Sequence, residues 1–126
     1  MSWLVTAAGI LASITAVAHI VAGGRDIARP LLESALDLEV KMTLYACWHL
    51  VSVSLVASSL VILAEGLGFI AYPPVVSYVS AIWILYAVTF LVVTLRVSKP
   101  PGLLRLPQWT LLLPVGLLGL LGVMLH

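Results

Sequence analysis

Four long apolar stretches dominate the chain, and short segments that carry most of its charged residues separate them. Each stretch has close to the roughly 20 residues that an α-helix needs to cross a bilayer. Because a backbone in hydrocarbon must satisfy its own hydrogen bonds, stretches of this composition are expected to be helical. We therefore predict an all-α membrane protein in which residues 1–126 form one domain of four antiparallel transmembrane helices. The predicted spans are Trp3–Ala22, Val40–Ala64, Val75–Val97 and Pro107–Leu125.

The connection between the first two stretches is amphipathic. Apolar and charged residues alternate there at roughly helical spacing. The apolar set is Ile27, Leu31, Leu32 and Leu36, and the charged set is Arg29, Glu33 and Asp37. This pattern is typical of a helix that lies on a membrane surface. We expect a short amphipathic helix on the inner surface between the first and second spans.

Basic residues are distributed unevenly between the connections. Arg25, Arg29 and Lys41 flank the first connection, and Arg96, Lys99 and Arg105 flank the third. The connection Glu65–Pro74 has no basic residue. Because Lys and Arg accumulate in cytoplasmic connections, both termini are expected on the outer, periplasmic side.

Composition supports the membrane assignment and excludes other classes. The chain is 63% hydrophobic and 9% charged, which is far from the composition of a soluble domain. Its net charge is +1 and it has no basic cluster, so we expect no nucleic-acid binding and a lipid bilayer as its environment. The first stretch lacks the basic residues of a signal peptide and is expected to be retained as a span. Cys47 is the only cysteine, so no disulfide can form within the chain.

Two histidines, His19 and His49, lie inside the first and second apolar stretches. An ionisable side chain in hydrocarbon is costly and usually faces a bundle interior, a cavity or a bound group. With a rise of 1.5 Å per residue, both positions fall roughly 5–13 Å below the inner boundary of the membrane. The two imidazoles are therefore the main candidates for a functional site.

Three interpretations of these histidines remain open. In the first, His49, Ser52 and Ser59 line an ion or proton path, since they share one helical stripe, and His19 gates it by protonation. In the second, His19 and His49 bind haem or a transition metal, although two ligands are too few for a closed zinc site. In the third, each ring hydrogen-bonds a neighbouring carbonyl or hydroxyl group, and the serines simply allow close helix packing.

Small residues recur at helical spacing in the first and last spans. Ala8, Ala12 and Ala16 are four residues apart, and Gly116, Gly119 and Gly122 are three apart. Such stripes allow helices to approach closely, within one subunit or between subunits. Four short helices enclose little volume, so a path on the axis of a homo-oligomer is favoured. Docking of these helices onto a larger membrane partner is an alternative.

No set of residues indicates an enzyme. A nucleophile, a base and an orienting group do not occur together, and no phosphate loop or HExxH motif is present. We assign no catalytic residue and expect no cofactor, with haem or a transition metal as the alternative. A lipid-modifying site at the inner surface is also left open. The leading hypothesis is a small oligomeric protein that conducts or transports ions or protons.

One group of residues resembles a known but uncharacterised family. His19 with Gly23, the segment Arg29-Pro30-Leu31-Leu32 and the segment Trp48-His49-Leu50 together resemble a small bacterial family of four-span membrane proteins. The resemblance covers about the first half of the chain. Ile20 departs from it, because a small polar residue often follows the first histidine in that family. The resemblance implies a bacterial inner-membrane origin and no particular activity.

Overall fold

Every regular element in the described part of the chain is a helix. The computed structural model describes residues 2–97, 102–103 and 106–125. The elements are α1 (Trp3–Ala18), the π-helix η1 (His19–Ala28), α2 (Arg29–Glu33), α3 (Leu38–Gly66), α4 (Pro73–Val97) and α5 (Trp109–Met124). The prediction of an all-helical chain with long apolar helices is thus confirmed.

Three helices are long and apolar enough to cross a membrane. They are the continuous helix Trp3–Glu33, α3 and α4. Helix α5 is apolar but shorter, and Pro114 lies inside it. The chain is therefore an integral membrane protein.

The structure does not contain the separate surface helix that the sequence predicts. Helices α1, η1 and α2 form one uninterrupted helix, and α2 is only its last turn. The backbone stays in the right-handed helical region at the junction residues Ala18 and Ala28. Gly23 and Gly24 stay in the helix too, since the only described residue with a positive φ is Gly68. Because no residue breaks the helix, the amphipathic segment extends the first span instead of lying across its end.

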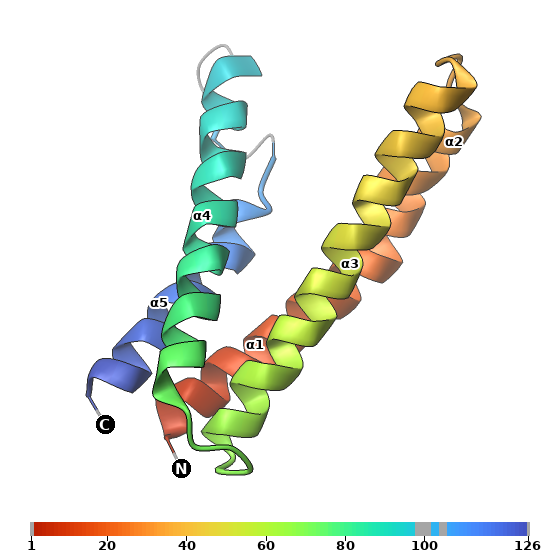
Figure 1. Cartoon of the computed structure of the whole chain (residues 1–126). Coiled ribbons are helices and arrows are strands. Elements are labelled where there is room, and N and C mark those ends of the chain that lie inside the picture. The colour runs from red at the N-terminus through yellow and green to blue at the C-terminus, as the bar shows by residue number, and fades with distance from the viewer. Residues whose placement is uncertain (1, 98–101, 104–105, 126) are drawn as a thin grey trace.

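The helices form two antiparallel hairpins. The first hairpin pairs the helix Trp3–Glu33 with α3, and the second hairpin pairs α4 with α5. Contacts between α1 and α5 join the two, whereas α3 and α4 touch much less. Figure 1 shows the hairpins close together near the termini and diverging toward α2 and the last turns of α4.

Charge follows this arrangement. The basic residues Arg25, Arg29, Lys41 and Arg96 belong to the diverging end, opposite both termini and the connection that joins α3 to α4 (Figure 1). Lys99, Arg105 and His126 lie outside the described residues. The described basic residues therefore occur at one end of the molecule, as the positive-inside argument requires.

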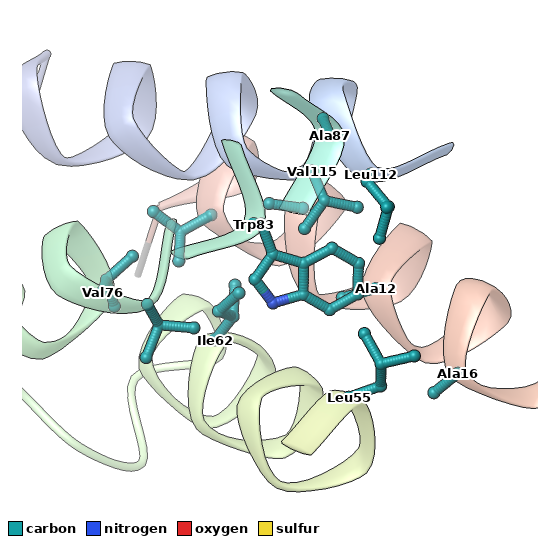
Figure 2. Close-up of a cluster of buried hydrophobic side chains, with 12 residues drawn as sticks. Ala12, Ala16, Leu55, Ile62, Val76, Trp83, Ala87, Leu112 and Val115 are labelled. Carbon is teal, nitrogen blue, oxygen red and sulfur yellow. The ribbon is translucent and has the colours of Figure 1, made fainter. Parts of the chain in front are cut away.

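The core lies where the hairpins meet, around Trp83 of α4. This side chain is fully buried, and Figure 2 shows it among residues of the other helices, including Ala12, Leu55 and Leu112. The indole Nε1 donates a hydrogen bond to Ser58 Oγ at 3.0 Å. One turn further along, Ser54 Oγ lies 3.1 Å from the Tyr86 hydroxyl oxygen. These two polar contacts connect α3 with α4.

Small residues bring the helix backbones close together. The stripe Ala8, Ala12 and Ala16 is buried in the core of this single chain. A methyl group on Gly66 of α3 would lie 2.5 Å from the Thr6 backbone nitrogen of α1. A methyl group on Gly122 of α5 would lie 2.9 Å from the Val5 backbone nitrogen. Only glycine allows α1 to pack this closely on both neighbours.

Candidate functional site

His19 stands where α1 changes into the π-helix and makes a polar contact with the neighbouring span. Its Nε2 lies 3.1 Å from the Oγ of Ser52 on α3. His19 is half-buried and Ser52 is buried, so this contact is shielded inside the first hairpin. The sequence predicted His19 as a gate and Ser52 as part of the path lining, and the structure shows that these two residues are direct partners.

The hydrogen-bond network determines which nitrogen of His19 carries the proton. Ser52 Oγ also lies 3.0 Å from the backbone oxygen of Trp48, and a carbonyl can only accept. Ser52 uses its one proton in that bond, so its oxygen must accept from His19 Nε2–H. A neutral His19 then has a bare Nδ1 that can accept a hydrogen bond or a proton.

Four aromatic rings contact one another next to the His19 ring, and we call His19, Tyr45, Trp48 and His49 the aromatic cluster. The His19 ring stacks on the Trp48 indole with 5.2 Å between centroids. His49 meets the same indole edge-on at 4.9 Å and Tyr45 edge-on at 4.5 Å. Trp48 thus contacts both imidazoles, and it is the residue that connects them.

Two glycines of the π-helix lie opposite the Trp48 ring. A methyl group on Gly24 would lie 3.8 Å from Trp48 Cη2, and one on Gly23 would lie 3.6 Å from Trp48 Nε1. Two adjacent glycines therefore face the indole from the opposite helix. Departures of this kind from α-helical geometry occur often at functional sites.

Trp48 has an unusual polar atom. Its indole Nε1 is buried and, among the described atoms, has no hydrogen-bond partner. A buried donor left unpaired costs about 1–3 kcal/mol. The nitrogen therefore marks a place where an acceptor would be stabilised.

The other two residues of the predicted stripe are not joined to the His19–Ser52 pair. Ser59 is buried, but its Oγ bonds the Val56 carbonyl oxygen of its own helix at 2.8 Å. His49 is exposed on α3 and touches only the aromatic cluster among the described ring contacts. The structure brings His19 and Ser52 together. Ser59 and His49 take no part in the His19–Ser52 contact.

A metal site needs more ligands than the described residues supply. No group of three or more His, Cys, Asp or Glu side chains that could hold a metal occurs in residues 2–97, 102–103 and 106–125. His19 and His49 are two imidazoles that each contact the Trp48 indole. Two imidazoles are therefore fewer than a closed metal site needs, although a haem iron takes only two axial ligands.

Charged residues at the end where the hairpins diverge pair locally. Arg25 bonds Asp26 through its Nε at 2.6 Å, and Arg29 bonds Glu33 at 2.9 Å one turn along the helix. Both pairs are largely exposed. Exposed pairs of this kind contribute little to stability and do not form a site.

Trp48 and Gly23 belong to the site, but neither is ionisable, so the sequence argument from the two histidines did not predict them. Both occur in the sequence group that carries the family resemblance, next to His49 and four residues after His19. Their proximity to each other depends on helix rotation, which sequence spacing alone does not determine.

No family model, no curated protein and no solved structure matches the chain. Its function is therefore inferred from the geometry of the site.

Proposed function

We propose that this protein transfers protons across the membrane and that His19 and Ser52 form the central step of its path. The observation that carries the proposal is the 3.1 Å contact between His19 Nε2 and Ser52 Oγ inside an apolar hairpin. An imidazole can accept a proton at Nδ1 and release one from Nε2, so it can relay protons near neutral pH. Ser52 can take the proton from Nε2 only while it passes its own proton to a further acceptor, so its hydroxyl group must turn away from the Trp48 carbonyl oxygen in this step.

This proposal moves the main role from His49 to His19. Among the described residues, Ser59 and His49 make no hydrogen bond to the His19–Ser52 pair, so they are not needed in its first steps. Ser59 lies two helical turns from Ser52 toward the outer side and would belong to a later part of the path. A path of this kind requires hydrated gaps between helices, which an assembly of several subunits can supply.

A homo-oligomer in a bacterial inner membrane completes the proposal. His49 is exposed on an apolar helix, and contact of an imidazole with acyl chains is costly. A second copy of the chain packed against this face would remove that cost. In this arrangement α5 is the fourth span, the basic connections are cytoplasmic and both termini are periplasmic.

A proton-flux assay tests the proposal. Purified protein is reconstituted in liposomes that contain a pH-sensitive dye, and an imposed pH gradient is followed with and without the protein. We expect the wild type to dissipate the gradient and Ser52→Ala to slow it by about tenfold, because the hydroxyl partner of His19 is lost. Ser13→Ala is the matched control, since Ser13 bonds only the Gly9 carbonyl oxygen of its own helix.

Two results would contradict the proposal. The first is a wild-type rate equal to that of protein-free liposomes. The second is an equal rate for Ser52→Ala and Ser13→Ala, which would remove Ser52 from the path.

Haem or metal binding is the second candidate, because His19 and His49 come from two neighbouring helices and both contact the same indole, at 5.2 and 4.9 Å between ring centroids. In that case the two imidazoles would be the axial ligands of a haem iron, whereas a closed transition-metal site would need further ligands from another subunit. Purified protein would then show a Soret band or a bound transition metal in elemental analysis. An accessory subunit of a larger complex is the third candidate, and stable self-assembly without a partner would argue against it.

A further inference from the structure

The first turns of α1 carry an apolar groove at the end of the molecule where both termini lie (Figure 1). Trp3, Ala7 and Ile10 line it at spacings of four and three residues, so they share one face of the helix. Thr6 and Leu67, the residue after α3, complete the lining. The groove has a volume of about 400 Å³. Ala7 has only a methyl group between an indole and a branched side chain, which leaves the space between them open.

The lining of the groove offers one free polar group. Thr6 Oγ1 donates to the Ser2 backbone oxygen at 2.9 Å, so its proton is already used. Trp3 is 77% exposed, and its indole N–H makes no hydrogen bond to another described residue. An indole can only donate, so it needs an acceptor. A ligand of this groove should therefore be apolar along Ala7 and Ile10 and carry an acceptor at the Trp3 end.

The depth of the groove in the membrane fits a lipid. Trp3 begins a helix that is long enough to span a bilayer, and a tryptophan at such an end lies at the level of the headgroups. With a rise of roughly 1.5 Å per residue, Ile10 lies about 10 Å deeper. A phospholipid has its phosphate and ester oxygens at the first level and its acyl chain at the second. A second copy of the chain fits less well, because a stable protein interface buries about 800 Å² per partner and this groove is only about 10 Å long.

Charge at this end favours one kind of headgroup. Glu65, in the last turn of α3, is the only charged side chain that the described residues place there. It precedes Gly66, whose carbonyl oxygen accepts from the Ser2 backbone N–H at 3.2 Å, so it lies close to the start of α1. One of its oxygens, Oε2, accepts from the Tyr72 backbone N–H at 2.8 Å. A headgroup with an ammonium is therefore favoured over an anionic headgroup.

We propose that this groove binds one zwitterionic phospholipid with an ammonium headgroup. Its acyl chain lies along Ala7 and Ile10, a phosphate or ester oxygen accepts from Trp3 Nε1–H, and its ammonium faces Glu65. The site shares no residue with the aromatic cluster or with the His19–Ser52 contact. It can therefore exist whether or not the protein transfers protons.

Two substitutions test the groove and one tests the headgroup. Ala7→Leu fills the groove, and Ala57→Leu is the matched control, since Ala57 is exposed on α3 outside the groove. Both add the same atoms to an apolar helix, so a general change in lipid contact affects them alike. Glu65→Gln removes the charge but keeps an oxygen that can accept from the Tyr72 N–H.

Native mass spectrometry of the purified protein in detergent measures the binding of the first lipid. The probes are phosphatidylethanolamine and, as the anionic control, phosphatidylglycerol with the same acyl chains. Ala7→Leu should bind the first phosphatidylethanolamine at least about tenfold more weakly than the wild type, because packing against the chain is lost, and Ala57→Leu should bind as the wild type does. The wild type should prefer phosphatidylethanolamine by about threefold, which is the effect of an exposed charge pair, and Glu65→Gln should lose this preference.

Fluorescence gives a second readout that needs no groove-filling variant. Phosphatidylethanolamine brominated on its acyl chain, added at one lipid per protein, should quench the wild type more than Trp3→Phe. The proposal is overturned if this quenching is equal in the two proteins, if Ala7→Leu and Ala57→Leu bind the first lipid equally, or if the wild type does not prefer phosphatidylethanolamine. Loss of a protein dimer in Ala7→Leu, with lipid binding unchanged, would assign the groove to a second copy and would also overturn it.

Discussion

Trp83 and Ser58 form a hydrogen bond that joins the two hairpins, with the indole Nε1 donating to the serine Oγ at 3.0 Å. Trp83 is completely buried, so its N–H group has no access to solvent. The Ser54–Tyr86 contact lies one turn further along, and Figure 1 shows that α3 and α4 diverge toward the start of α3 and the end of α4. This contact therefore adds a buried hydrogen bond to the packing of α1 on α5 that also joins the hairpins.

Ser58→Ala should therefore destabilise the fold by about 1–3 kcal/mol, because it leaves a buried donor unpaired. Unfolding in mixed micelles followed by circular dichroism measures the effect. Ser77→Ala serves as control, since Ser77 makes a long 3.3 Å bond to its own helix at an exposed position. Equal stability of the two variants would show that the hairpins are held together without this bond.

Gly66→Ala should weaken the first hairpin by about 1–3 kcal/mol, because the new methyl group meets the backbone of Thr6 and the helices must move apart. Gly24→Ala changes the same residue type where the nearest atoms lie at 3.8 Å. That variant should alter the free energy of unfolding by less than about 1 kcal/mol. A neutral Gly66→Ala would mean that α1 and α3 are not packed this closely.

The tautomer of His19 should be the form protonated at Nε2. The Ser52 hydroxyl group donates to the Trp48 carbonyl oxygen and can only accept from the imidazole. In protein labelled with ¹⁵N at histidine, the side-chain ¹⁵N shifts of neutral His19 distinguish the two tautomers. Ser52→Ala removes the acceptor and should allow the Nδ1–H form to appear, whereas an Nδ1–H form in the wild type would contradict the network.

The proposed orientation can be tested with single cysteines in a Cys47→Ser background. Phe69, in the connection between α3 and α4, and Ala35, after α2, are both exposed. A membrane-impermeant maleimide added to intact cells should label Phe69→Cys and spare Ala35→Cys until the cells are opened. The reverse pattern would place the termini in the cytoplasm.

Hydrophobic pattern alone predicted the long helices, because span length and backbone hydrogen bonding leave few alternatives in a bilayer. The end of the first helix was predicted wrongly. Its amphipathic pattern describes which side of a helix is polar, and it does not say whether the chain turns before Arg29. Nothing in Gly23-Gly24 forces a break, so the helix continues to Glu33.

The site was only partly predictable for a related reason. His19 and Ser52 stand out because polar side chains are rare in apolar helices, but their contact depends on how the two helices are rotated. The π-helix changes that rotation from His19 onward, and sequence periodicity gives no sign of it. Trp48 was not singled out as a site residue because an aromatic residue is common in such a helix, although it proves to contact both imidazoles.

The most direct measurement compares proton flux through His19→Gln and His49→Gln proteins in liposomes, with Ser13→Ala as the structural control. The account predicts that His19→Gln slows the wild-type flux by at least about tenfold, because glutamine cannot exchange protons, and that His49→Gln slows it less. A His19→Gln protein that conducts as well as the wild type, or a larger loss in His49→Gln, would contradict the central role of the His19–Ser52 pair.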